Sequence, residues 1–299
     1  DTSKKFSVGD SVFLQIPVGD KQQTKIVARS NIKIPDEELY EYGEEPVEEG
    51  TIYLSCPEDG DGLIKVYTLD GTPGTDISPG SNALYNIIYA GEYLYFSHGA
   101  AYSVHRIKLD GTGYQQIVMQ GRYYNASGLA INSTGTYLYT AYTTWEPSYG
   151  IAKINISTGE VEETDITSVF FDEIADLCGD GTYLYLLGRS MRGTSRIAVY
   201  DFNLNFIREI STGGIYSKIA ADGTNLYLTI NDVEAGNIEV RTTTGNFVQS
   251  ISCTGTRAIG VNDSNIYAVT QSKVKKYNSS GVFQSEFEVE GTVEDCVII

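Results

Sequence analysis

Side chains able to do chemistry are sparse in this chain of 299 residues. It has two histidines, His98 and His105, and a metal site built on them needs further converging ligands that the sequence does not mark. The Gly-x-Ser-x-Gly nucleophile elbow, the Walker phosphate loop and the dinucleotide fingerprint are all absent. We therefore expect no catalytic residue, no metal ligand and no cofactor, and the sequence predicts a protein that is not an enzyme.

A short phrase recurs along the chain and indicates the elements that must position any functional side chain. Its clearest copy, residues 179–186, reads Gly-Asp-Gly-Thr-Tyr-Leu-Tyr-Leu. The last tyrosine of the phrase falls at positions 53, 95, 139, 185, 227 and 267, at intervals of 40 to 46 residues. A period of that length is typical of one four-stranded blade of a propeller.

Each copy of the phrase is flanked by further strand and turn signals. Glycine accepts positive φ in a tight turn, and the tyrosine-leucine run favours a strand. A second β-patterned stretch follows and ends in a turn such as Asp70-Gly71, which indicates a hairpin. An apolar stretch, for example residues 219–221, precedes every copy except the first. The pattern predicts an all-β fold, a six-bladed β-propeller of four-stranded antiparallel blades with the apolar stretches as inner strands.

The two ends of the chain complete this organisation. The first copy of the phrase, at residues 50–55, has no inner strand before it, whereas residues 293–299 are an inner-strand pattern with nothing after them. We expect this C-terminal strand to pair into the first blade and close the ring, since closure removes an open sheet edge. Residues 50–299 are then the propeller domain, and residues 1–49 are a separate N-terminal segment.

The N-terminal segment is predicted to be a β-hairpin followed by an acidic linker. Two β-patterned runs, 11–16 and 25–29, flank a Gly-Asp-Lys turn, and residues 36–49 carry eight acidic residues and no basic one. One interpretation is that the hairpin folds back onto the first blade or covers one side of the ring. The other is that residues 1–49 are a connector for self-assembly, which would make the protein a structural subunit of a larger assembly.

Several repeats resemble those of NHL-type six-bladed propellers. The residues that carry this resemblance are 196–201 with 205–207, 237–240 with 245–248, and 222–227. The resemblance covers residues 50–299 and implies the propeller fold. That broad group includes ligand-binding receptor domains, scaffolds, lyases and lactonases, so the fold by itself does not select a function.

Gluconolactonase-like propellers in the same group hold a divalent ion on oxygen ligands at the ring axis. In this chain Asn86, Asp176 and Asp295 lie on predicted inner strands and offer such oxygens. Calcium takes about six to eight oxygen ligands, more than these three side chains supply. A metal-dependent hydrolase or lyase that uses the central channel is therefore the alternative to a binding protein.

The loops that join second to third strands, and those that lead from each outer strand into the next inner strand, lie on one face of a propeller. The predicted ligand-binding residues of this face are Arg122, Tyr123, Tyr124, Trp145, Tyr149, Arg189 and Arg192. Phe171, Tyr216 and Arg257 belong to the same loops. Exposed aromatic and arginine side chains suit a protein or glycan partner, whereas the other interpretation is that each packs locally over its blade. We expect a non-catalytic binding or scaffold propeller that uses this face.

Charge and sequons indicate the setting in which the protein works. The chain has 39 acidic and 21 basic residues, for a formal net charge of −18. That acidity opposes binding to nucleic acid or to anionic membranes, and no apolar run reaches the roughly 18 residues of a membrane span. Five Asn-x-Ser/Thr sequons occur, at Asn125, Asn132, Asn155, Asn262 and Asn278. These candidate glycosylation sites fit an extracellular or cell-surface glycoprotein.

Four cysteines occur, at positions 56, 178, 253 and 296, and none forms the Cys-x-x-Cys pair of a structural zinc site. Cys56 ends the second strand of the first blade and Cys296 lies on the closing inner strand, so a disulfide between them would lock the ring. The other interpretation is that both are buried thiols that pack as small hydrophobic side chains.

Overall fold

The computed structural model of the chain describes most of the predicted propeller. The described residues are 50–57, 62–80, 84–98, 103–118, 125–143, 149–166, 171–189, 193–230, 236–262 and 265–299. The chain divides into the units Asp1–Pro46 and Val47–Ile299, and the described residues all belong to the second. The predicted N-terminal hairpin and acidic linker lie outside them.

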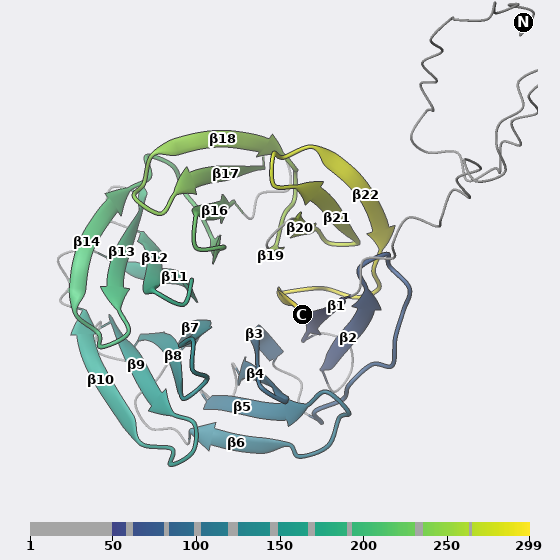
Figure 1. Cartoon of the computed structure of the whole chain (residues 1–299), viewed down its shortest axis with the longest axis horizontal. Helices are drawn as coiled ribbons and strands as arrows, with labels where there is room; N and C mark the ends of the chain where they lie inside the picture. Colours follow the sequence, from purple (N-terminus) through teal and green to yellow (C-terminus); the bar gives the residue numbers. More distant parts are fainter. Residues whose placement is uncertain are drawn as a thin grey trace, which may run out of the picture. The chain divides into compact units, whose positions relative to one another are not determined.

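Within these residues the chain forms twenty-three strands in six antiparallel sheets, arranged as the blades of a ring (Figure 1). The inner strands, from the first blade to the sixth, are β23 (Asp295–Ile298), β3 (Leu84–Ala90), β7 (Asn125–Ile131), β11 (Glu173–Gly179), β15 (Lys218–Ala221) and β19 (Ala258–Val261). The second strands are β1 (Thr51–Cys56), β4 (Tyr93–His98), β8 (Tyr137–Thr143), β12 (Tyr183–Arg189), β16 (Asn225–Thr229) and β20 (Asn265–Val269).

The third strands are β2 (Leu63–Thr68), β5 (Ser103–Lys108), β9 (Tyr149–Asn155), β13 (Ser195–Asp201), β17 (Asn237–Thr242) and β21 (Lys273–Asn278). The outer strands of blades two to six are β6 (Gln115–Val118), β10 (Val161–Ile166), β14 (Phe206–Ser211), β18 (Phe247–Ser252) and β22 (Phe283–Glu288). The predicted six-bladed propeller is thereby confirmed. No helix in the described ranges has the length and hydropathy to cross a membrane.

The C-terminal strand closes the ring as predicted. β23 pairs antiparallel with β1, so that Ile298 lies opposite Ile52. Beyond the strand, the amide of Thr51 donates to the carbonyl of Ile299 at 2.7 Å, and the amide of Ile299 donates back to Thr51 at 2.9 Å. The first blade is therefore assembled from both ends of the propeller domain.

The first blade departs from the four-stranded pattern in its outer strand. Its sheet has three strands, and the outer segment pairs with β2 through isolated bridges, Ile77 to Ile64 and Pro73 to Tyr67, in place of a continuous ladder. The amides of Ile64 and Ile77 each donate to the other's carbonyl at 2.9 Å. Proline has no backbone N–H, so Pro73 cannot donate to a ladder, and the pairing does not extend into a strand.

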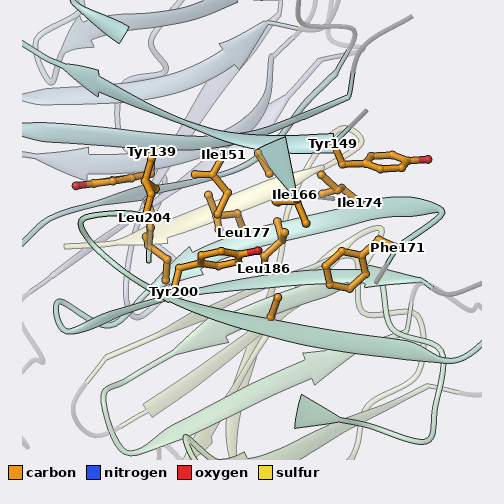
Figure 2. Packing of buried hydrophobic residues seen from close by; sticks show 14 residues of the cluster. Tyr139, Tyr149, Ile151, Ile166, Phe171, Ile174, Leu177, Leu186, Tyr200 and Leu204 are labelled. Carbon is orange, nitrogen blue, oxygen red and sulfur yellow. The ribbon is translucent and has the colours of Figure 1, made fainter. Parts of the chain in front are cut away.

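The repeated tyrosine forms the contact between neighbouring blades. Tyr139 of β8 packs in an apolar cluster with Leu177 of β11 and Leu186 of β12, which belong to the following blade (Figure 2). The equivalent tyrosines are all buried: Tyr53, Tyr95, Tyr185, Tyr227 and Tyr267. An aromatic side chain buries roughly 150–250 Å². The tyrosine therefore recurs at each blade because each interface requires its packing.

The aspartate of the phrase holds the turn and the tyrosine together. One oxygen of Asp180 accepts hydrogen bonds from the amides of Thr182 and Tyr183, both at 2.7 Å. The other oxygen accepts from the hydroxyl of Tyr185 at 2.7 Å. Asp222 repeats the arrangement with Thr224, Asn225 and Tyr227. The carboxylates of both phrases are thus engaged within their own blades.

No disulfide joins Cys56 to Cys296 in this structure, although a disulfide was one of the two interpretations of this pair. The strand register places Cys296 opposite Leu54, whereas Cys56 lies two residues further along β1, opposite Leu63. Both side chains are buried in one apolar cluster with Ile52 and other core residues. This is the arrangement of the second interpretation, in which the cysteines pack as small hydrophobic side chains.

Candidate functional site

One layer of the central channel brings together polar side chains from several blades. In every blade the repeated tyrosine pairs with one residue of the inner strand. The layer position is the residue two places before that partner in the sequence. From the first blade to the sixth these residues are Asp295, Asn86, Gly128, Asp176, Lys218 and Ala258. The register shifts just before or at this position in β3, β7 and β11, and a bulge re-aims a side chain. We call the four polar members, Asn86, Asp176, Lys218 and Asp295, the channel cluster.

Lys218 is the centre of the channel cluster. Its Nζ donates to Oδ1 of Asn86 at 3.1 Å and lies 3.9 Å from Oδ1 of Asp295. Asn86 is in the second blade and Lys218 in the fifth, so this contact joins opposite sides of the ring (Figure 1). Sequence reasoning found the three oxygen-bearing residues but missed Lys218. The available signal was a lysine that opens an otherwise apolar inner-strand pattern.

The two aspartates of the channel cluster also fasten neighbouring inner strands. Oδ2 of Asp176 accepts a hydrogen bond from the amide of Ile219 at 3.0 Å, and Ile219 belongs to the next blade. Oδ2 of Asp295 accepts one from the amide of Ile87, also at 3.0 Å and also in the next blade. Each carboxylate therefore acts as an acceptor between blades, in addition to its interaction with Lys218.

Burial and shared charge shift the pKa values of the channel cluster. Burial raises the pKa of Asp176, Lys218 opposes this effect and the nearby Asp295 adds to it, and the net pKa is about 6. Burial likewise raises the pKa of Asp295, again against the effect of Lys218. Burial lowers the pKa of Lys218, but Asp295 and Asp176 outweigh that effect and the net pKa is raised. One ammonium thus lies near two carboxylates, of which Asp176 is buried and Asp295 is partly buried.

This donor set does not fit a calcium ion. The oxygens of Asn86 and Asp295 face an ammonium, and the second oxygens of both aspartates accept backbone amides. A divalent ion at the same place would be repelled by Lys218 and would find too few oxygens. Among the described residues, no group of three or more His, Cys, Asp or Glu side chains is placed to hold a metal. The side chain of Lys218 thus lies where a metal ion bound by Asn86, Asp176 and Asp295 was considered.

The two histidines lie together in the second blade. Nε2 of His105 is 2.6 Å from the hydroxyl of Ser103, and its Nδ1 is 2.8 Å from the hydroxyl of Tyr114. The rings of His98 and His105 are 5.2 Å apart, and Phe96 stacks on His105. Burial, together with His98, lowers the pKa of His105 to about 4. Because Ser103 and His105 are both buried, the group is placed to pack the blade.

The predicted ligand-binding face is described only in part. Arg122, Tyr123, Tyr124, Trp145 and Arg192 lie outside the described residues. Tyr149 is not a surface residue, because its side chain is 9% exposed, sits in the core cluster of Figure 2 and donates its hydroxyl to the carbonyl of Asp172. Phe171 and Tyr216 are buried as well. For these three aromatic residues, local packing is the arrangement found.

Charged side chains of the same face form two ion pairs at least partly open to solvent. Arg189 ends β12 and contacts Glu173 at the start of β11, with 3.6 Å between Nη1 and Oε2. Arg257, just before β19, lies 3.9 Å from Glu294, just before β23. Inner strands begin where antiparallel second strands end, so both ion pairs lie at the edge of the ring that also holds the entrance to the channel cluster. We call this edge the loop face.

Four of the five sequon asparagines have a structural role in turns. Oδ1 of Asn132 accepts the amides of Thr136 and Tyr137, both at 2.9 Å, in place of the aspartate of the repeated phrase. Asn262 accepts the amide of Asn265 in the same way. Asn155 and Asn278 accept amides in the turns after their third strands. Asn125 opens β7. Glycosylation of all five stays a prediction.

No family model matches the chain, and no curated protein matches it. TolB from Acinetobacter baumannii is similar in structure, with 15% identity, a TM-score of 0.65 and coverage of 83% of this chain and 66% of the TolB chain. A chain from a nidogen/laminin complex gives 12% identity, a TM-score of 0.65 and coverage of 83% and 97%. A functionally unknown protein from Desulfotomaculum acetoxidans gives 14% identity, a TM-score of 0.56, and coverage of 81% of this chain and 80% of that chain. At such identities the likeness shows the fold alone, and nothing tests the NHL type.

Proposed function

We propose that this chain is a non-catalytic propeller that binds a protein partner through the loop face. The observation that carries the proposal is Lys218, whose ammonium lies among the axial oxygens that a metal-dependent enzyme of this architecture would need for its ion. We therefore assign the channel cluster a structural role in the ring and assign partner binding to the loop face.

The comparisons support a binding role for such a ring. One matched chain was solved within a complex of nidogen and laminin, and the match covers 97% of that chain. The other named match is TolB, of which this chain spans 66%. Propellers use loop surfaces positioned by a rigid scaffold for recognition. We extend that role to this chain as a proposal, with an extracellular or cell-surface location and a glycan as the other class of partner.

The loop face offers charge for recognition. Its ion pairs are Arg189 with Glu173, whose side chains are exposed, and Arg257 with Glu294, whose side chains are partly buried. Arg122, Tyr123, Tyr124, Trp145 and Arg192 are proposed to add aromatic and cationic contacts beside them. Arginine and aromatic residues dominate binding energy at protein interfaces, so loss of one such contact weakens binding by about tenfold or more.

The test compares charge reversals on the two edges of the ring. Arg189→Glu changes the loop face, and Lys108→Glu is its matched control, because each cation is 38% exposed and pairs with one glutamate, but Lys108 ends β5 at the opposite edge. The immobilised protein is incubated with the secreted and surface proteins of its source, and captured proteins are quantified by mass spectrometry. Circular dichroism first establishes that both variants are folded.

A partner that wild type and Lys108→Glu retain, and that Arg189→Glu loses by about tenfold, supports the loop face. Equal capture by all three proteins would contradict it. The enzyme alternative has a separate readout, since a metal-dependent hydrolase should carry a stoichiometric divalent ion after purification. Such an ion, lost on Asp295→Asn, would overturn the non-catalytic proposal.

A further inference from the structure

The channel cluster places an amine, a carboxamide and a carboxyl group within reach of one another. Nζ of Lys218 is 3.1 Å from Oδ1 of Asn86 and 3.9 Å from Oδ1 of Asp295. Asn86 is 6% exposed, and the side chains of Lys218 and Asp295 are 17% and 19% exposed. Little water reaches the group, and the three residues come from three different blades.

We propose that Lys218 and Asn86 join in an intramolecular isopeptide bond, with Asp295 as the group that transfers the protons. Held in contact, an amine and a carboxamide react as parts of one molecule, which replaces the entropy cost of a collision with that of folding. Lysine amines are established nucleophiles toward carbonyl carbon once deprotonated. No cofactor, oxidant or further reactant is required.

The atoms balance without external reagents. Nζ of Lys218 first approaches Oδ1 of Asp295 from 3.9 Å to hydrogen-bond distance and gives it one proton, and the free amine then attacks Cγ of Asn86. The new bond joins Nζ to Cγ, and the bond between Cγ and Nδ2 breaks. The departing nitrogen takes up the proton held by Asp295 and the surplus proton of the attacking amine, and it leaves as ammonium. An ammonium and a primary amide thus become a secondary amide and an ammonium ion.

The surroundings fix each reactant in place. Nδ2 of Asn86, the leaving nitrogen, donates to the hydroxyl of Ser97 at 3.0 Å, and the amide of Asn86 donates to the same hydroxyl at 3.1 Å. The amide of Ile87 holds the second oxygen of Asp295 at 3.0 Å. These contacts restrict the rotamers of both side chains, which is the condition for a high effective concentration.

The acid–base properties suit a slow reaction that occurs once per molecule. Burial raises the pKa of Asp295, so its carboxylate is a better proton acceptor than an exposed one. Asp295 and Asp176 also stabilise the ammonium of Lys218, so only a small fraction of Lys218 is the free amine that can react, and the reaction is slow. Such a low rate would not suit an enzyme with many turnovers, but it suffices for a cross-link that forms once in each molecule.

The bond would also form only after the ring has closed. Asp295 lies on β23, the strand that completes the first blade, so the transfer group is absent until the ring has closed. Asn86 and Lys218 are 132 residues apart, and a bond between them joins the second blade to the fifth. Such a cross-link limits the separation of the blades even if β23 later detaches.

The experiment measures the intact mass of the full chain after denaturation and reduction, following production in a host that does not glycosylate asparagine. We expect wild type to be lighter than its sequence by one ammonia, and a protease digest to contain one branched peptide joining the segments of Asn86 and Lys218. Lys218→Arg keeps the cation but removes the nucleophile and should have the full sequence mass. Asp295→Asn should be folded by circular dichroism and also keep the full mass.

Wild type that retains the full sequence mass after prolonged incubation would overturn the proposal. Loss of one water instead of one ammonia would place the bond on a carboxyl group and exclude Asn86. A cross-link that still forms in Asp295→Asn would remove Asp295 from the proton transfer.

Discussion

At the scale of single residues, Lys218 determines the charge balance in the channel. Before the proposed cross-link forms, the layer position holds two carboxylates and one ammonium, so the charge of Lys218 compensates Asp176 only in part. In a buried site an undercompensated carboxylate holds its proton more tightly than in water. The ionisation of Asp176 is therefore coupled to the stability of the folded ring.

We predict that the free energy of unfolding falls as the pH rises from about 5 to about 7.5, and that Asp176→Asn removes most of this fall. The pKa of Asp176 is about 6 in the folded ring against an ordinary value of 3.8. Its stabilising contribution is therefore complete below the lower value and is lost as the pH rises through the higher one. Lys218 on β15 and Asp295 on β23 are the charged groups that face it. Urea unfolding at the two pH values measures the effect.

The matched control for this prediction is Glu92→Gln. The side chain of Glu92 is 77% exposed in a surface ion pair with Lys108, so its removal should leave the pH dependence as in wild type. The same slope in wild type, Glu92→Gln and Asp176→Asn would show that another group is responsible.

At the scale of elements, the inner strands pack closely enough that side-chain size decides their sequence. Gly128 on β7 has a φ of +74°, and a Cβ added there would lie 2.0 Å from the backbone nitrogen of Leu177 on β11. Gly135, in the turn after β7, has a φ of +66° and no atom within 4 Å of its added Cβ. The two glycines thus share a backbone conformation and differ in the space around them.

We predict that Gly135→Ala lowers the free energy of unfolding by about 1–2 kcal/mol, the cost of left-handed backbone for alanine. Gly128→Ala should lower it by about 3 kcal/mol or more, since the strain is the same and the methyl group also collides with the backbone of the next blade. Urea unfolding of the two variants gives the difference directly. Equal losses would mean that β7 and β11 can move apart at no cost.

At the scale of the whole molecule, the propeller is closed by its C-terminal strand, and all twenty-three strands that the structure describes belong to residues 50–299. The backbone partners of β1 are β2 and β23, both within residues 50–299. Loss of β23 therefore exposes an edge of β1 and one side of the channel, whereas loss of the first 48 residues removes no described strand.

We predict that a chain beginning at Glu49 unfolds cooperatively like the full chain, and that a chain ending at Glu290 does not, because it lacks the inner strand of its first blade. Thermal unfolding followed by circular dichroism compares the two. Light scattering on the same samples tests the connector interpretation, in which the full chain assembles and the chain from Glu49 is a monomer. If the chain from Glu49 aggregates or unfolds, the N-terminal segment belongs to the core and the connector interpretation fails.

The sequence by itself determined the number of blades, the position of their strands and the closure of the ring. These features are local and repeated, because a turn glycine and an alternating strand leave the same signal in each blade whatever surrounds them. The repeat count placed β23 in the first blade, but it could not show that Pro73 leaves that blade without a continuous outer strand. The strand-level prediction for residues 50–299 was otherwise confirmed, whereas the N-terminal hairpin stays a prediction.

Only the tertiary structure decided what the channel and the loop face contain. Asn86 and Lys218 are far apart in the chain and meet because the ring brings opposite blades within the length of a lysine side chain. No local pattern encodes such a contact, so the same oxygens suggested a metal until Lys218 was placed among them. Tyr149 was expected on the surface for the same reason, since burial depends on what the neighbouring blade packs against it.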